Sequence, residues 1–179
     1  MSCWARERND VGRPRDEGYP IRGIVKNKML HLHNFETNRW PACNPETGYM
    51  DTDGSPTKTA VLQSRTNGAA SRYWELSFGK RVGEELYDLK HDPDCLTNLV
   101  GQPAYGPVAE QLKAQMMSEL RQQEDPRVLG RGHIFDEYPS DDVAVRGFYE
   151  RHQRGAVMKT GWVNPSDFEK LSVEPAPVP

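Results

Sequence analysis

Large apolar side chains are scarce in this chain, and that scarcity limits its fold more than any other feature of the sequence. Leu, Ile, Val and Phe together supply 33 of the 179 residues, about 18%. A share below about 20% indicates disorder only when the net charge is also high. Here the net charge is -3, from 23 basic and 26 acidic residues mixed along the chain. We therefore expect one folded domain with a thin core, and the 14 Pro and 15 Gly predict many turns.

The composition also excludes several classes of protein. No apolar run approaches the roughly 18 residues of a transmembrane helix, so no membrane partner is expected. Residues 1–8 lack the apolar stretch of a signal peptide, so none is expected there. The pI of about 6.0 gives no electrostatic reason to expect nucleic acid. Cys3, Cys43 and Cys95 form no C-x-x-C pair, so they predict neither a disulfide framework nor a zinc site.

The clearest periodic segments are a hairpin and one long helix. Apolar and polar residues alternate over 29–35, and together with residues 21–25 this predicts a β-hairpin that turns at 26–28. A further short strand is expected over 85–89. Residues 107–123 form the best helix, because Val108, Leu112, Met116 and Leu120 recur every four residues between Pro107 and Asp125-Pro126. Strands come first and the long helix follows, so the expected class is α+β, with a small antiparallel sheet.

The other segments are assigned from cap and turn signals. Ser55-Pro56 reads as an N-cap and a first helical residue, which predicts a short helix to about residue 64. The aromatic segment 71–78 fits a helix or a strand equally well. The polar residues 1–20 are expected to form a loop or an exposed arm, and loops are also expected over 36–54 and 126–142. A short helix is expected within 143–154, followed by a disordered Pro-rich tail over 174–179.

Two small clusters could in principle bind a metal. His31 and His33 lie on one face of a strand, but no third ligand is near in sequence, so an exposed strand face is favoured. The segment 51–54 (Asp-Thr-Asp-Gly) resembles the start of a calcium loop. An EF-hand needs Glu at the twelfth position, which is Leu62 here, so an Asx-type turn before Ser55 is favoured.

One cysteine and one group of arginines have a possible chemical role. Cys43 begins a C-x-P-x-x segment, whereas sulfatases carry C-x-P-x-R, in which the Cys becomes formylglycine. Thr47 occupies the Arg position, so Cys43 is interpreted as an ordinary loop thiol. The N-terminal arginines could contact an anionic ligand through bidentate hydrogen bonds, although a solvated segment is the more usual meaning. They are Arg6, Arg8, Arg13, Arg15 and Arg22.

A series of longer motifs runs through about residues 6–150. They are Glu7-Arg8-Asn9-Asp10-Val11-Gly12-Arg13-Pro14, Gly18-Tyr19-Pro20-Ile21-Arg22, His33-Asn34-Phe35, Arg39-Trp40-Pro41, Pro45-Glu46-Thr47-Gly48-Tyr49, 53–58, 73–81, Glu84-Glu85-Leu86-Tyr87-Asp88-Leu89, Asp92-Pro93, Asn98-Leu99 and Asp125-Pro126-Arg127. Together these motifs resemble the C-terminal subdomain of the sulfatase family, closest to bacterial enzymes similar to heparan N-sulfatase (N-sulfoglucosamine sulfohydrolase). One departure is Asn9, because the family often has His at that position.

The resemblance implies a small antiparallel sheet with a C-terminal helix packed across it. It divides the chain into a polar N-terminal arm (1–20), a sulfatase C-terminal subdomain (21–125) and a loop-rich extension (126–179). The formylglycine, the calcium ligands and the catalytic His and Lys of a complete sulfatase belong to a separate, upstream α/β catalytic domain. No cofactor is therefore expected in this chain, and a periplasmic or secreted location is implied only for the complete enzyme.

The resemblance also implies a role at the rim of a site for sulfated glycans. The candidate substrate-binding residues are Arg8, Asn9, Asp10, Arg39, Trp40 and Asp53. Arginine suits sulfate or carboxylate, and a Trp face can stack on a pyranose. The expected partners are the upstream catalytic domain and a sulfated glycan, and the chain alone is expected to be inactive. A stand-alone carbohydrate-binding or interaction module and a non-functional, truncated gene fragment stay open as alternatives. A subdomain without its partner is also expected to expose an apolar patch.

Overall fold

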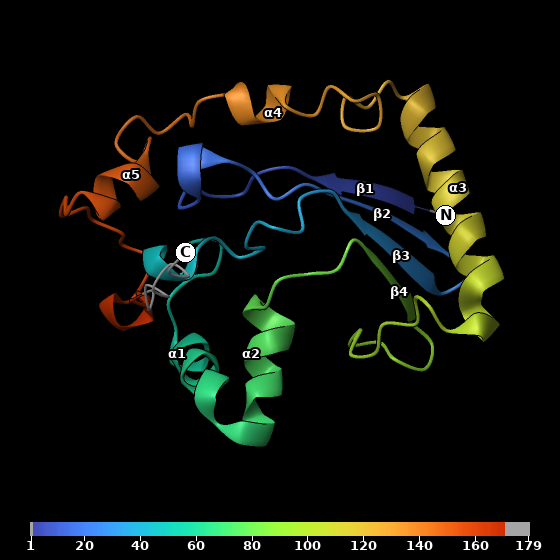
Figure 1. Cartoon of the computed structure of the whole chain (residues 1–179), viewed down its shortest axis with the longest axis horizontal. Coiled ribbons are helices and arrows are strands. Elements are labelled where there is room, and N and C mark those ends of the chain that lie inside the picture. Colours follow the sequence, from blue (N-terminus) through green and yellow to red (C-terminus); the bar gives the residue numbers. More distant parts are fainter. Residues whose placement is uncertain (1, 171–179) are drawn as a thin grey trace, which may run out of the picture.

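The centre of the molecule is a four-stranded antiparallel sheet with the strand order β1-β2-β3-β4 (Figure 1). A computed structural model describes residues 2–170. A long helix, α3 (Gly106–Gln122), lies across one face of the sheet, and this confirms the predicted α+β class. The strands are β1 (Ser2–Arg6), β2 (Ile21–Lys26), β3 (Met29–Asn34) and β4 (Glu84–Asp88).

The predicted hairpin is present as β2 and β3. Ile24 pairs with His31, and the two-residue turn consists of Asn27 and Lys28. Both turn residues have left-handed backbone angles, with φ of 52° and 65°. A turn with positive φ at both positions matches the right-handed twist of the flanking strands, so it sets the register of the hairpin.

The main core lies between the sheet and α3. Cys3, Ile24, His31 and Leu86 form one cross-strand row, and Ile24 and Leu86 are completely buried. Against this row α3 places a stripe of apolar residues, which packs on β2 and β4. The buried residues of that stripe are Leu112, Met116 and Leu120.

Two short helices, α1 (Pro56–Gln63) and α2 (Ser71–Phe78), lie side by side and away from α3 (Figure 1). The Ser55 hydroxyl accepts a hydrogen bond from the Lys58 backbone N–H at 3.1 Å, which confirms the predicted N-cap. The segment 71–78, for which the sequence favoured neither state, is helical. A second small core joins both helices to the long loop through Ala42, Tyr49, Leu62 and Phe78.

A third small core connects the C-terminal extension to the long loop. Phe148 and Val163 pack there against Val11, Cys43 and Met50. The extension contains the short helices α4 (Ile134–Glu137) and α5 (Phe148–Gln153). Single 3-10 turns occur at Pro14–Asp16, Pro45–Thr47, Ser64–Thr66, Gly68–Ala70, Pro103–Tyr105 and Pro165–Asp167. Three small cores in place of one large core agree with the thin core expected from the composition.

Two predictions about local structure are wrong. Residues 1–20 are neither an exposed arm nor a loop throughout, because β1 pairs with β2 and most of residues 11–20 are buried. The predicted loop over 126–142 contains α4, whereas the short helix expected within 143–154 is present as α5. The predicted disordered tail, residues 174–179, lies outside the described part of the chain. Over residues 2–170, no helix combines the length and the apolar character that a membrane crossing requires.

Candidate functional site

The N-terminal segment folds onto the long loop because Arg13 binds there. Only 1% of Arg13 is exposed, and its guanidinium donates to the Trp40 carbonyl at 2.7 Å and to the Pro41 carbonyl at 2.9 Å. It also forms an ion pair with the buried Asp51 carboxylate at 2.6 Å. Buried charges are tolerated when they are paired and hydrogen-bonded. Arg13 therefore holds the fold together and is not available to an anionic ligand.

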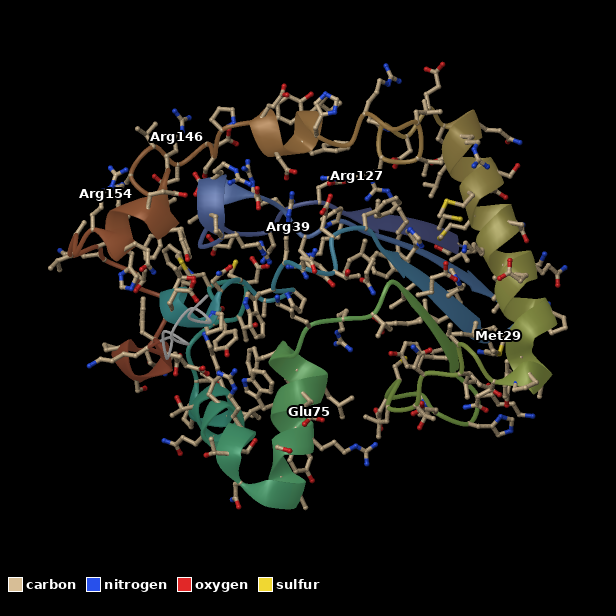
Figure 2. The ribbon with its side chains drawn as sticks, in the orientation of Figure 1. Met29, Arg39, Glu75, Arg127, Arg146 and Arg154 are labelled. Atoms are coloured by element: carbon tan, nitrogen blue, oxygen red, sulfur yellow. The ribbon has the colours of Figure 1, made fainter. Side chains whose placement is uncertain are left out.

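Arg39, one of the predicted site residues, is also held by protein groups. Its Nη2 atom lies 2.9 Å from Asp136, its Nη1 atom donates to the Gly18 carbonyl at 2.9 Å, and its Nε atom lies 3.3 Å from Glu17. Although burial alone would lower the pKa of Arg39, the hydrogen bond with Asp136 raises it. Arg39 and Arg127, both labelled in Figure 2, approach the same Asp136 carboxylate at 2.9 Å and 3.8 Å.

Trp40 belongs to an aromatic cluster between the long loop and α2. Its ring meets Tyr49 edge-on at a centroid distance of 6.5 Å and Trp74 at 6.2 Å. The Lys80 ammonium lies 5.2 Å from the Trp40 ring centroid, which is within cation–π distance. The ring is half-buried, so one part contributes to packing while another part stays accessible.

The other four candidates lie in two places. The Arg8 guanidinium donates to the carbonyls of Asp16 at 3.0 Å and Tyr138 at 2.9 Å, and the adjacent Asn9 is exposed. The Asp10 N–H donates to Asp51, and Asp53 is exposed. Burial raises the pKa of Asp10, and the hydrogen bond from the Val11 N–H lowers it in part. The negative charges of Asp51 and Asp53 raise it further. Asp10 therefore lies beside Asp51.

Two of the six candidates, Arg39 and Trp40, line one cavity of about 390 Å³. Arg15 lies in the same lining, and 78% of its side chain is exposed. Glu17 and Glu36 add two carboxylates to the wall. Arg8, Asn9, Asp10 and Asp53 are not part of this lining.

The chemistry of this cavity combines charge with a flat aromatic surface. Arg15 forms an ion pair with Glu17, but its high exposure leaves it able to turn toward a ligand. Carboxylate oxygens of Glu17 and Glu36 can accept hydrogen bonds from hydroxyl groups. The indole of Trp40 offers an apolar face. The arrangement suits a hydroxylated ring that carries one negative group beside Arg15.

The sequence alone did not identify Glu17 and Glu36 as part of this cavity. Both are isolated carboxylates in irregular segments, so no periodicity places them on a particular face. Arg15 belonged to the N-terminal arginine group, but the sequence did not distinguish it from Arg13. The difference comes from burial, since Arg13 is 1% exposed whereas the Arg15 side chain is 78% exposed.

The histidine pair predicted on an exposed strand face lies in a different environment. His31 is fully buried under α3, and His33 is half-buried. The Nε2 atom of His31 lies 3.7 Å from Glu84, and the Nδ1 atom of His33 lies 3.9 Å from the same carboxylate. The prediction of an exposed face is therefore wrong. Within residues 2–170, no three His, Cys, Asp or Glu side chains gather in a way that could hold a metal ion.

The calcium-like segment and the loop thiol also have structural roles. The Asp51 carboxylate is bound by two guanidiniums, those of Arg6 and Arg13, so it interacts with cations of the protein itself. Cys43 is fully buried, and its thiol donates to the Val11 carbonyl at 3.1 Å. Burial raises the pKa of Cys43 well above its ordinary value, so the reactive thiolate is suppressed.

A comparison with known protein families finds none that matches this chain, and a search of curated proteins finds no similar sequence.

Proposed function

We propose that this chain is the C-terminal portion of a sulfatase similar to heparan N-sulfatase, and that it supplies the rim of a binding site for sulfated glycans. In the complete enzyme, a separate catalytic domain would carry the formylglycine and the calcium ligands and would hydrolyse a sulfate ester or sulfamate. This chain would hold the sugar beside that centre. Its own residues bind and orient substrate, and none of them acts as the nucleophile.

The observation that carries the proposal is the cavity that brings Arg39 and Trp40 together with the exposed Arg15. Arg39 and Trp40 come from one of the segments that carry the family resemblance, and their side chains suit sulfate contact and sugar stacking. The small antiparallel sheet with a helix across it is the architecture that the resemblance implies. Both features agree with what the resemblance implies.

Binding of a sulfated sugar tests the rim. The chain is titrated with N-sulfated glucosamine oligosaccharides and with the same oligosaccharides after removal of sulfate. We expect Arg15→Ala to weaken binding of the sulfated form by about tenfold, the effect of one charge-assisted hydrogen bond. Trp40→Ala should weaken both forms, because it removes the stacking surface.

Two controls separate a role in binding from a role in folding. Arg72→Ala removes an exposed arginine from α2, outside this cavity, and should bind like the wild type. Arg39→Ala removes ion pairs with Asp136 and Glu17, so its melting temperature must be compared before its affinity is interpreted. Equal binding of sulfated and desulfated sugar by every variant would contradict the rim assignment.

Because the proposal assigns catalysis to a separate domain, it predicts whether this chain is active alone. The purified chain should show no turnover of an aryl sulfate or of glucosamine N-sulfate, because its only C-x-P segment has Thr47 in place of Arg and its Cys43 is buried. Co-expression with a product encoded upstream that carries a C-x-P-S-R motif and a carboxylate pair should restore turnover. Activity of the chain alone above a mock preparation, or no activity of the pair, would refute the proposal.

A further inference from the structure

A second cavity, of about 360 Å³, lies on the face of the sheet opposite α3. The strands supply its floor through Ile21, Leu30 and Leu32, which point away from the row that α3 covers. Segments of the long loop, of α2 and of the turn after β4 form its walls. Its volume falls within the range of about 300–1,000 Å³ that small-molecule sites occupy.

One buried polar group in this lining has no partner. Tyr19 is completely buried, and within the described part of the chain its hydroxyl makes no hydrogen bond. An unpaired buried hydroxyl is costly, so its presence calls for an explanation. Burial raises the pKa of Tyr19 to about 12, and the charged side chains that act on it most strongly are Glu85 and Arg81. Tyr19 lines the cavity together with both of these residues.

The charges of this lining are already balanced. Arg6 lies 2.8 Å from Asp51, and the nearest guanidinium nitrogen of Arg81 lies 3.8 Å from Glu85. The lining contains one more charged residue, Asp94, and this residue is exposed. An anion or a cation would therefore find no unmatched inner charge. Neutral hydroxyl groups can use the remaining N–H groups of the arginines and the remaining lone pairs of the carboxylates.

An exposed aromatic face lies next to the cavity floor. Trp4, Gly23, Leu32 and Glu85 form one cross-strand row, and the last two of these line the cavity. The Trp4 ring rests directly on Gly23, where an added Cβ would approach the ring to 2.5 Å. Glycine at this position lets the indole lie flat on the sheet, and 40% of Trp4 remains exposed. An indole surface beside neutral polar groups suits the apolar face of a sugar ring.

We infer that this cavity is a binding site for one neutral sugar residue, distinct from the cavity at Arg39. The ring would rest on Leu30 and Leu32 with its edge toward Trp4. Its hydroxyls would bond to Tyr19 and to the more exposed Arg81, because the Glu85 carboxylate already accepts hydrogen bonds from Asn34 and Tyr87. The inference depends on this cavity alone and does not require the proposed sulfatase function.

Titration with neutral and charged monosaccharides tests the site. The probes are N-acetylglucosamine and glucose as neutral sugars, and glucuronate and glucosamine 6-sulfate as charged ones, each followed by amide chemical shifts of the chain. We expect saturable shifts of β2 and β3 amides with a neutral sugar in the millimolar range and weaker binding of both charged sugars. Preference for either charged sugar at these amides would overturn the inference.

Tyr19→Phe gives the decisive variant, because the hydroxyl that it removes makes no hydrogen bond in the described structure. Its melting temperature should equal or exceed that of the wild type, while its affinity for the neutral sugar should fall about tenfold. Trp4→Ala should also weaken binding. Tyr138→Phe, at an exposed tyrosine outside the cavity, is the matched control and should bind normally. Unchanged affinity in Tyr19→Phe, or no saturable binding by the wild type, would refute the site even if sulfated glycans bind at Arg15.

Discussion

The protonation state of one buried residue, His31, depends on its surroundings in the fold. His31 lies between Ile24 and Leu86 in the cross-strand row that α3 covers, and neither of its ring nitrogens has a hydrogen-bond partner in the described structure. Burial lowers the pKa of His31, and the nearby Glu84 carboxylate compensates only in part. The neutral ring is therefore the form that the fold accepts.

This arrangement predicts a loss of stability in acid. Below the ordinary histidine pKa of about 6.5 the unfolded chain binds a proton that native His31 resists, so the free energy of unfolding falls as the pH falls below 6.5. Burial lowers the pKa of His33 as well, so it adds to the same trend. His31→Leu should lose less stability between pH 7 and pH 5 than the wild type. It should also be more stable by about 1 kcal/mol at pH 7, because it removes an unsatisfied buried group.

Urea unfolding at several pH values measures both effects. His133→Gln, at an exposed histidine, serves as the control and should keep the pH dependence of the wild type. If His31→Leu and the wild type lose stability in parallel as the pH falls, then His31 is not the group responsible.

At the scale of single elements, the sequence predicted the helices and strands whose conformation is determined by their own residues. Alternation over 29–35 marked β3, and the four-residue spacing from Val108 to Leu120 marked α3, because each pattern reports which side of an element is buried. β1 was missed because Ser2–Arg6 contains no β-branched residue. Its conformation is set by pairing with β2 and by the contact between Trp4 and Gly23, which no local pattern reveals.

The hairpin turn offers a prediction at this scale. Lys28 is exposed and has φ of 65°, a left-handed angle that costs a residue with a Cβ about 1–2 kcal/mol. Lys28→Gly removes this cost and adds a smaller entropic one, so the free energy of unfolding should rise by about 0.5–1 kcal/mol. Asn27→Gly is the matched control, because Asn already tolerates this region and should gain less. Thermal and urea unfolding measure the stability of both variants. If Lys28→Gly were less stable than the wild type, the left-handed backbone of Lys28 would not be a source of strain.

At the scale of the whole molecule, a chain of ion pairs joins segments that are distant in sequence. Glu7 links Arg22 to Arg127, which approaches Asp136, and Asp136 in turn binds Arg39. These contacts connect the N-terminal segment, the long loop and the C-terminal extension. The sequence identified a group of arginines but not their partners, since long-range pairs such as Glu7–Arg127 and Arg39–Asp136 depend on the tertiary fold. Arg39 and Trp40 are neighbours in the sequence, so their shared position was predictable. The sequence did not predict that the carboxylates of Glu17 and Glu36 would line the same cavity, because that also depends on the tertiary fold.

Glu7 is the member of this network whose loss should cost most. Its two carboxylate oxygens accept separately from Arg22 and Arg127, whose side chains are only 1% and 5% exposed. Glu7→Gln would leave both buried guanidiniums with less negative charge and turn an amide N–H toward one of them. Breaking a buried pair costs about 3–5 kcal/mol, and we expect about 2–3 kcal/mol here because the Glu7 side chain is 21% exposed. Urea unfolding of Glu7→Gln against Glu137→Gln, at an exposed carboxylate, measures the difference. Equal stability of the two variants would mean that the N-terminal segment is held by Arg13 and β1 alone.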